Sequence, residues 1–239
     1  MQALIDGASC LGIKLSSAQV EQFQTYYEDL IDWNSRVNLT AITDYHEVQL
    51  KHFVDSLSIA LALPKSIPSA CHIIDVGTGG GFPGIPLKIT FPQIRLTLLE
   101  ATGKKCDFLH HIVQHLALNY VDVLCVRSED AARMPEYREQ FDVALTRGLA
   151  KMVVLSELTL PFCKIGGKLI AQKKDDIGVE LKFASNAISI LGGQPAQIIS
   201  VAIPELNDQR CLVVVNKSSH TPQQYPRRNG VPAKKPLAV

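Results

Sequence analysis

The segment that decides the fold is Asp75-Val-Gly-Thr-Gly-Gly-Gly-Phe-Pro-Gly-Ile-Pro86, a glycine-rich loop that follows a short β-branched run and precedes a helical pattern. Glycines allow the chain to turn tightly and a ligand to approach the backbone. In an open α/β sheet the first such loop lies at the carboxyl ends of the strands, where ligands bind. The segment therefore predicts a ligand site at that edge of a sheet.

The spacing within the loop argues against two common nucleotide sites. The dinucleotide pattern G-x-G-x-x-G fits Gly77 and Gly79, but its third glycine position is occupied by Phe82. The phosphate-loop pattern fails because no Gly-Lys followed by Ser or Thr closes the loop. A nicotinamide-dependent oxidoreductase is therefore the least favoured enzyme class.

Short apolar runs rich in β-branched residues recur on both sides of the loop, separated by helical patterns. Such runs are typical of strands buried in a parallel sheet, and their alternation with helices predicts helices on both faces of that sheet. We expect strands at 71–76, 95–100, 121–126, 141–146 and 168–173, and helices near 84–91, 104–118, 150–163 and 176–191.

The last two apolar runs, 197–203 and 211–217, are joined by a short loop with no helical pattern, so they should pair antiparallel. A mostly parallel sheet that ends in an antiparallel pair resembles, by analogy between folds, the Rossmann-like sheet of class I S-adenosylmethionine-dependent methyltransferases. The expected fold class is therefore α/β of this type, preceded by an N-terminal helical segment.

The first 64 residues carry two helical patterns. Ser16 or Ser17 caps the first helix, whose apolar positions follow the 3.6-residue period. The second helix starts at Asp44, with Glu47 three residues on, and continues to Pro64. We divide the chain into an N-terminal helical extension (1–64), a methyltransferase domain (65–217) and a basic proline-rich tail (218–239).

Composition excludes several classes of protein. Of 239 residues, 46% are hydrophobic and 20% are charged, which is typical of a globular protein with a real core and excludes disorder of the whole chain. Apolar runs are too short and interrupted to span a bilayer, and the N-terminus lacks the pattern of a secretory signal. We expect a cytoplasmic protein whose six scattered cysteines are reduced packing residues, not a disulfide framework or a zinc site.

Charge is concentrated in the tail. The formal net charge is +1, yet the residues from Ser218 onward hold four basic side chains and no acid, which leaves −3 for the rest. The prolines predict that this tail forms neither a helix nor a central strand, and its few apolar residues predict that it builds no core. Its basic residues either keep the chain soluble, dock it on the domain or contact nucleic-acid phosphates: Arg227, Arg228, Lys234 and Lys235.

Two acids flank the glycine loop. Asp75 ends the first strand, where its carboxylate either interacts with the cationic methionine end of the cofactor or orients the loop. Glu100 ends the second strand, 23 residues after Gly77, where an acid commonly binds ribose hydroxyls. The plain alternatives are a loop-capping Asp75 and a solvated strand end at Glu100.

The loop and its surroundings resemble the glucose-inhibited-division-B family, the bacterial methyltransferases that modify N7 of a guanine in small-subunit ribosomal RNA. The resemblance covers about residues 20–237. Its motifs are DVGTGGGFPGIPLKI at 75–89, NLTAI at 38–42, HFVDSL at 52–57, Leu99-Glu100, Arg127-Ser128-Glu129, Thr146-Arg147-Gly148-Leu149-Ala150 and YPRRNGVPAKKPL at 225–237. It implies S-adenosylmethionine as cofactor and 16S ribosomal RNA or the small subunit as partner. Independently of the resemblance, the default expectation is a monomer that binds neither a metal nor a membrane.

The resemblance also implies roles at matching positions. Glu100, Ala101 and Thr102 would lie along the ribose, and Ser128 and Glu129 would meet the adenine. Two departures from the family pattern are Ser128, where Ala or Val is common, and Thr146-Arg147-Gly148, where Ser-Arg-Ala is common. The full predicted cofactor set is Gly77, Gly79, Phe82, Asp75, Glu100, Ala101, Thr102, Ser128, Glu129 and Arg147.

The expected chemistry requires positioning rather than a general base, because guanine N7 carries a lone pair and no proton. Arg147 suits a guanine, since its planar donors match O6 or a phosphate. Asp55 is a candidate for stabilising the positive product, and His52 and Asp55 complete the catalytic set with Arg147. Phe82 and Trp33 are candidates for stacking on a flipped base.

Plain structural roles compete with several of these assignments. A His in the position of His52 is more often a partly buried polar residue than a catalyst, and an Asn in the position of Asn38, a candidate RNA contact, more often stabilises a turn. His111 and His115 have the i, i+4 spacing of metal ligands, but no third ligand is evident, so a solvated helix face is expected. The alternative functions are a non-catalytic nucleotide- and RNA-binding module, or a methyltransferase acting on a protein or a small molecule.

Overall fold

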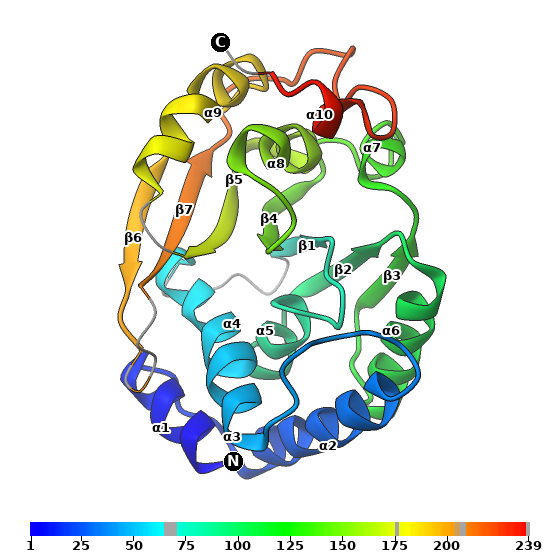
Figure 1. Ribbon diagram of the computed structural model, residues 1–239, viewed down its shortest axis with the longest axis vertical. Helices are drawn as coiled ribbons and strands as arrows, with labels where there is room; N and C mark the ends of the chain where they lie inside the picture. Colours follow the sequence, from blue (N-terminus) through cyan, green and yellow to red (C-terminus); the bar gives the residue numbers. More distant parts are fainter. Residues whose placement is uncertain (65–70, 175–176, 204, 206–208, 238–239) are drawn as a thin grey trace.

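The structure is a computed structural model that describes residues 1–64, 71–174, 177–203, 205 and 209–237. Its centre is a seven-stranded sheet in the order β3-β2-β1-β4-β5-β7-β6 (Figure 1). The strands are β1 His72–Val76, β2 Arg95–Glu100, β3 Val121–Cys125, β4 Phe141–Arg147, β5 Cys163–Lys174, β6 Gln197–Val201 and β7 Arg210–Asn216.

The sheet confirms the predicted fold class. β1 pairs in parallel with both β2 and β4, so that Asp75 lies opposite Leu98 on one side and Leu145 on the other. β7 runs antiparallel to both β5 and β6, which confirms the predicted antiparallel pairing of 197–203 with 211–217. The strand order reverses between β1 and β4, and the glycine loop follows β1 at this switch point.

Helices cover both faces of the sheet. Successive strand residues point to opposite faces, and Ile73 and Ile74 of β1 accordingly belong to two different cores. The helices are α5 Gly84–Thr90 and α6 Gly103–His115 in the first core, and α8 Met152–Thr159 and α9 Gly178–Ile190 in the second. Residues 65–70, where the predicted methyltransferase domain starts, and residue 176 of the predicted fourth helix lie outside the described residues.

The N-terminal extension packs on the first face and shares its core with the sheet. Its first helix, α1 Gln2–Cys10, is not one of the two helices predicted from the sequence. The next helix, α2 Ser17–Asn34, begins with a capping box formed by Ser16 and Gln19. Within the described part of the chain, no helix combines the length and the apolar character that crossing a membrane requires.

The predicted second helix starts at Asp44 but is not one regular α-helix. The Asp44 side chain accepts the Glu47 backbone N–H at 2.9 Å, as the sequence indicated. A π-helical turn then interrupts the α-helical pattern, and such turns recur at functional sites. The segment consists of α3 Tyr45–Val48, the π-helical η1 Gln49–Val54, α4 Asp55–Leu57 and the 3-10 helix η2 Ser58–Ala62.

Helix α2 supports the glycine loop through Tyr26, which the apolar periodicity had not selected. Tyr26 is fully buried, and its hydroxyl donates a hydrogen bond to the Gly80 carbonyl oxygen at 2.5 Å. Its ring stacks on Phe82 at 5.3 Å and on Phe53 at 5.4 Å. The N-terminal extension therefore supports the glycine loop through the contacts of Tyr26 with Gly80 and Phe82.

Two expectations about the rest of the chain were wrong. The tail does contain a helical turn, α10 Val231–Lys234, because Pro232 lies in its first turn, where proline is tolerated.

Cys106 and Cys125 form a disulfide, although reduced cysteines were expected. The sequence separation of 19 gave no hint, since only the packing of α6 on β3 brings the two Cα atoms to 6.0 Å.

The Tyr26 hydroxyl provides a stability test of the loop support. Tyr26→Phe keeps the stacking but removes the donor to a buried carbonyl, so urea denaturation should give a free energy of unfolding lower by about 2 kcal/mol. Tyr27→Phe is the matched control, because the Tyr27 hydroxyl bonds the Thr43 carbonyl at an exposed site, and it should change stability by less than about 0.5 kcal/mol. Equal effects of the two variants would contradict the assigned support.

Candidate functional site

A cavity of about 670 Å³ lies at the carboxyl ends of β1 to β4. Its size is that of a pocket for a nucleoside-sized ligand. Each of the four strands contributes the residues that follow it, as the fold predicts. Eight of the predicted cofactor residues line it: Gly77, Gly79, Glu100, Ala101, Thr102, Ser128, Glu129 and Arg147.

The glycine loop presents bare backbone to this cavity. Gly77 has φ +71° and Gly79 has φ +59°, in the left-handed region that favours glycine. A Cβ on Gly77 would lie 2.6 Å from the Leu149 side chain, whereas one on Gly79 would meet no protein atom within 4 Å. At Gly79 the loop therefore leaves open space over its backbone, which suits the close approach of a ligand such as S-adenosylmethionine.

Glu100 holds the floor of the cavity together. One carboxylate oxygen accepts the backbone N–H groups of Ala101 at 2.9 Å and Thr102 at 2.8 Å, and the other accepts that of Gly79 at 3.1 Å. The oxygen that accepts the Gly79 N–H has a further lone pair for a ligand hydroxyl. The acid thus fixes the loop after β1 to the loop after β2 and faces the cavity where ribose hydroxyls would lie.

Two predicted cofactor residues, Asp75 and Phe82, lie outside the cavity lining. Asp75 is fully buried, and one of its oxygens accepts the Thr78 hydroxyl at 2.6 Å and the Gly84 N–H at 2.8 Å. Burial raises the pKa of Asp75 to about 6, against the opposing effect of these two hydrogen bonds. The structure therefore gives Asp75 the loop-orienting role that was one of its two predicted readings.

The C-terminal tail forms one wall of the cavity, a role that the sequence did not predict. Asn229, Gly230 and Ala233 line it. The Gly230 N–H donates to Glu129 at 2.9 Å, and the Asn229 side chain donates to Asp130 at 2.7 Å. These bonds hold the tail beside the short helix α7 Ser128–Ala131, which follows β3.

Arg227 anchors the tail to the second core. Its side chain forms a bidentate pair with the fully buried Glu157, with contacts of 2.6–3.2 Å, and its backbone N–H donates to the same carboxylate. This guanidinium is thereby engaged within the protein. Arg228, Lys234 and Lys235 are exposed, and their predicted RNA contacts stay predictions.

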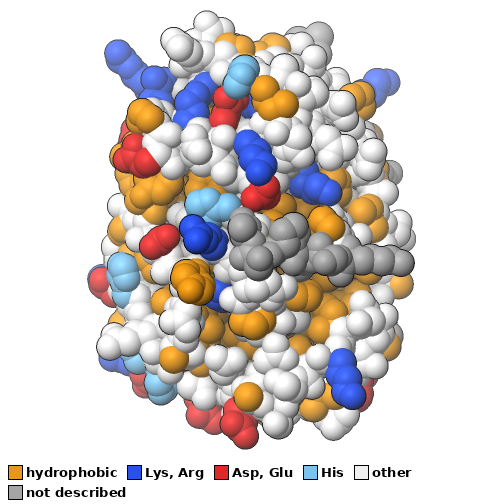
Figure 2. Space-filling model, turned by 180° about the vertical axis from the view of Figure 1, so that it is seen from behind, with side chains coloured by type: hydrophobic (Ala, Val, Ile, Leu, Met, Phe, Trp, Pro, Cys, Tyr) orange, Lys and Arg blue, Asp and Glu red, His pale blue; other side chains and the backbone are white. Residues whose placement is uncertain are grey.

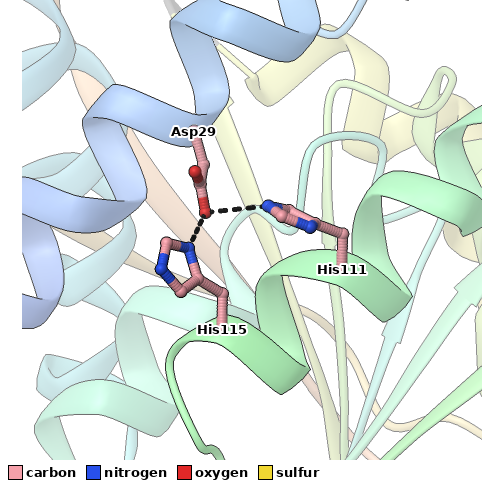
Figure 3. A group of neighbouring side chains, drawn as sticks. All are labelled: Asp29, His111 and His115. Carbon is pink, nitrogen blue, oxygen red and sulfur yellow. Dashed lines mark hydrogen bonds and ion pairs between the residues drawn. The ribbon is translucent and has the colours of Figure 1, made fainter.

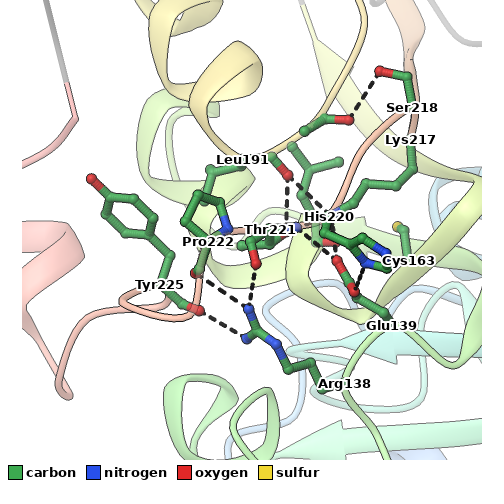
Figure 4. A network of polar contacts seen from close by, with 12 residues as sticks. Arg138, Glu139, Cys163, Leu191, Lys217, Ser218, His220, Thr221, Pro222 and Tyr225 are labelled. Carbon is green, nitrogen blue, oxygen red and sulfur yellow. Dashed lines mark hydrogen bonds and ion pairs between the residues drawn. The ribbon is translucent and has the colours of Figure 1, made fainter.

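A second anchor lies where the tail leaves β7 (Figure 4). The fully buried ammonium of Lys217 lies 3.2 Å from Glu139 and donates to the carbonyl oxygens of Leu160 and Leu191. Arg138 donates to tail carbonyls at Thr221 and Tyr225. The buried charge of Lys217 needs this acid to balance it, so the tail is held both where it leaves β7 and at Arg227.

Arg147 joins the cofactor cavity to a second cavity of about 310 Å³, because its side chain lines both. Its guanidinium donates to Asp55 at 3.1 Å and lies over the Phe82 ring at 4.9 Å. The second cavity is rich in cations and polar groups: Lys51, His52, Asp55, Ser58, Arg147, Gln172, Lys173, Lys174 and Arg210, with Ile42, Val201 and Leu212 among its apolar residues.

His52 and Asp55, the other two predicted catalytic residues, meet Arg147 in this second cavity. The His52 ring stacks on Phe82 at 4.6 Å, with Nδ1 3.3 Å from Arg147 and Nε2 2.7 Å from the Thr40 hydroxyl. Burial first, and the Arg147 charge second, lower the pKa of His52 to about 3. His52 is therefore neutral across the physiological range and serves to orient Arg147.

The remaining predicted contacts are Phe82 and Trp33, which were candidates for stacking on a base, and Asn38, which was a candidate RNA contact. Phe82 and Trp33 do not present open ring faces for stacking: Phe82 is covered by Tyr26, His52 and Arg147, and Trp33 packs on Phe108 and His111. Asn38 is exposed in a surface hollow beside the cofactor cavity, together with Arg36, Lys104 and Lys105. The turn that contains Asn38 is held by Asn34, whose side chain accepts the backbone N–H groups of Leu39 and Thr40.

A family model described as GidB, rRNA small subunit methyltransferase G, matches residues 19–211. The chain belongs to this family. Proteins called ribosomal RNA small subunit methyltransferase G are 51% identical in Dehalococcoides mccartyi, over 99% of this chain and all of the relative, and 44% identical in Leuconostoc mesenteroides, over 98% of each chain. These matches confirm the resemblance found in the sequence.

Solved structures confirm the fold of this GidB-family protein. The precorrin-6y C5,15-methyltransferase of Geobacter metallireducens superimposes with a TM-score of 0.50 and 15% identity, over 69% of this chain and 88% of that one. The CMeT domain of citrinin polyketide synthase gives 0.52 and 12%, over 80% and 56%. The fold and the family are those of S-adenosylmethionine-dependent methyltransferases.

Asp75 gives a pH-dependent test of the loop. Because its folded-state pKa is raised, the stability it contributes is complete below its ordinary pKa near 4 and is lost as pH rises through about 6. Asp75→Asn lacks this titration, so its free energy of unfolding relative to the wild type should rise by about 3 kcal/mol between pH 4 and 8. A flat difference for Asp75→Asn over this range would contradict the assignment.

The tail wall is tested by removing its anchor. Arg227→Ala leaves the buried Glu157 without its cation, so thermal denaturation should show a loss of about 3 kcal/mol, and S-adenosylmethionine affinity should fall in calorimetric titration. Arg228→Ala, the exposed neighbour, should leave both quantities within error. Unchanged cofactor affinity in Arg227→Ala would show that the tail is not part of the wall.

Proposed function

We propose that this GidB-family methyltransferase transfers the methyl group of S-adenosylmethionine to N7 of a guanine in 16S ribosomal RNA, in the cytoplasm. The observation that carries the proposal is the place of Arg147 in the lining of both cavities. One cavity fits the cofactor, and the smaller cationic one fits a single unpaired base with its phosphate. Arg147 lies where the two ligands would meet.

The cofactor is assigned to the larger cavity by the groups that line it. S-adenosylmethionine, when bound, supplies an electrophilic methyl group. Glu100 accepts hydrogen bonds from ribose hydroxyls, the bare backbone at Gly77 and Gly79 admits the ligand closely, and the segment Ser128–Glu129 faces the adenine. The Ser128 hydroxyl donates to the Leu158 carbonyl, so we expect the adenine to meet backbone groups there.

The acceptor chemistry explains why the site lacks a general base. N7 of guanine offers a lone pair and releases no proton on methylation, so orientation supplies most of the rate enhancement. His52 stays neutral and holds Arg147, and Asp55 is shared between two arginines. Arg147 then donates to guanine O6 or to a phosphate and leaves N7 open to the methyl group.

The product base carries a positive charge, and the second cavity contains one buried carboxylate to balance it. Asp55 has one oxygen 3.1 Å from Arg147 and the other 2.8 Å from Arg210. When guanine forms hydrogen bonds with Arg147, the Asp55 carboxylate remains within the same network. We therefore assign Asp55 to positioning Arg147 and to offsetting the charge of the product.

RNA contact outside the cavities is assigned to small basic sites rather than to one broad surface. On the face shown in Figure 2, the described basic side chains lie singly among acidic, apolar and other groups. The hollow of Asn38, Lys104 and Lys105 adjoins the cofactor cavity through Thr102 and Lys105, and the exposed tail cations Arg228, Lys234 and Lys235 lie beyond the tail wall. Ribosomal proteins of the small subunit can complete such a footprint.

The decisive experiment measures both the product base and the role of Arg147. Tritiated methyl transfer to small ribosomal subunits that lack the modification, followed by nucleoside analysis, should give N7-methylguanine. Arg147→Ala should lower the rate by at least about 100-fold, and Arg147→Lys should restore little, because lysine lacks the planar donor fork. Methylation of a different atom would overturn the N7 assignment; cofactor binding without any transfer would favour a non-catalytic binding module.

The tail cations are tested through salt dependence. Replacing Arg228, Lys234 and Lys235 by Ala together should weaken RNA binding and reduce the slope of log affinity against log salt by up to about 2. Lys182→Ala on the exposed face of α9 is the control and should leave the slope unchanged. An unchanged slope in the triple variant would show that these three residues do not contact RNA phosphates and would favour a solubilising role.

A further inference from the structure

Three metal-ligating side chains meet between α2 and α6, outside both cavities (Figure 3). Oδ2 of Asp29 lies 3.1 Å from Nε2 of His111 and 2.6 Å from Nδ1 of His115. The three ligand atoms all lie within 4.8 Å of one another. Figure 3 shows both imidazoles on one face of α6, directed at a carboxylate that comes from the neighbouring helix.

The third ligand, Asp29, cannot be recognised from its spacing in the sequence. His111 and His115 alone have the i, i+4 spacing of a metal pair, and such spacing is common on solvated helices. Asp29 lies 82 residues before His111, and only the packing of α2 against α6 brings it to the pair. The helices are held in register by Gln22, whose side chain donates to the Leu116 carbonyl at 3.0 Å.

We propose that Asp29, His111 and His115 form a binding site for a divalent transition-metal ion, with Zn²⁺ as the best match. Two imidazoles and one carboxylate are a common zinc set, and three protein ligands leave a fourth position for water. Mg²⁺ and Ca²⁺ prefer oxygen ligands throughout, so the two imidazoles select against them.

The cluster needs side-chain shifts of about 1 Å to accept the ion. Zinc–ligand bonds of about 2.0–2.2 Å in tetrahedral geometry place ligand atoms about 3.3 Å apart. The two Asp29 contacts therefore need to open by less than about 1 Å, and the two imidazole nitrogens, which lie within 4.8 Å of each other, need to close by up to about 1.5 Å. The His111 ring is already oriented by contact with Trp33 at 5.1 Å between centroids. Binding replaces two N–H···O hydrogen bonds, and the displaced ring protons move to the opposite ring nitrogens or to water.

An ion at this position links α6, whose Lys105 lines the cofactor cavity, to α2, which supports the glycine loop. One turn before Asp29, Tyr26 of α2 holds the glycine loop, and α6 begins directly after Thr102, which lines the cavity. Hydrogen exchange should therefore slow in both α2 and α6 when the metal binds. This inference does not depend on which base the enzyme methylates.

The test is a metal titration of the full-length, chelator-treated protein by calorimetry with Zn²⁺ and by visible absorption with Co²⁺. A Cys10→Ser background removes the exposed free thiol, which would otherwise compete for metal. We expect one ion per chain. His115→Ala and Asp29→Asn should each weaken Zn²⁺ binding by about 10- to 100-fold or more. Asn can still form hydrogen bonds with both imidazoles, so that variant should remain folded.

His110→Ala is the matched control, because His110 is exposed on the same helix and is not part of the cluster. It should bind Zn²⁺ as tightly as the parent protein. Equal affinity in all variants would place the metal elsewhere and overturn the proposal. An absence of binding by protein whose circular dichroism shows it folded would show that the cluster is only a hydrogen-bonded contact between the helices.

Discussion

One buried carboxylate, that of Asp55, ties together the parts of the molecule on which the site depends. Its two oxygens are shared between Arg147 at the end of β4 and Arg210 at the start of β7, and it comes from the N-terminal helical segment. Removing an acid from water is costly unless cations accompany it, so the three elements can pack only in the arrangement that brings these arginines to Asp55. That same arrangement aims Arg147 at the boundary between the two cavities.

The other residues of the site hold loops and side chains in place and are not themselves reactive groups. Glu100 fixes the loops after β1 and β2 by accepting three backbone N–H groups, and the anchored tail closes the far wall of the cofactor cavity. His52 is held neutral against Arg147 and Phe82. A reaction that needs no proton transfer at its acceptor atom requires this kind of rigid orientation, and an S-adenosylmethionine-dependent methylation of guanine N7 is such a reaction.

The sequence predicted the sheet well, because buried parallel strands are short apolar runs and the final antiparallel pair had no helix between its strands. It also identified Gly77, Glu100 and Arg147, which directly follow or end strands at one edge. What it missed depends on long-range packing: the buried hydroxyl of Tyr26, the tail wall at Asn229 and Gly230, and the third ligand Asp29. Composition left three roles open for the tail: solubilising the chain, docking on the domain or contacting RNA. The partner that holds Arg227, Glu157, lies 70 residues earlier in the sequence. The disulfide was missed for the same reason.

The contact between Asp55 and Arg147 predicts that Asp55 acts on methyl transfer through Arg147. The most direct test is a double-mutant cycle on the single-turnover rate of methyl transfer, with Asp55→Asn, Arg147→Ala and the combined variant at saturating S-adenosylmethionine. If Asp55 works by positioning Arg147, the combined variant is no slower than Arg147→Ala alone. If the two losses multiply, Asp55 acts independently of Arg147, and the account of a shared positioning network is wrong.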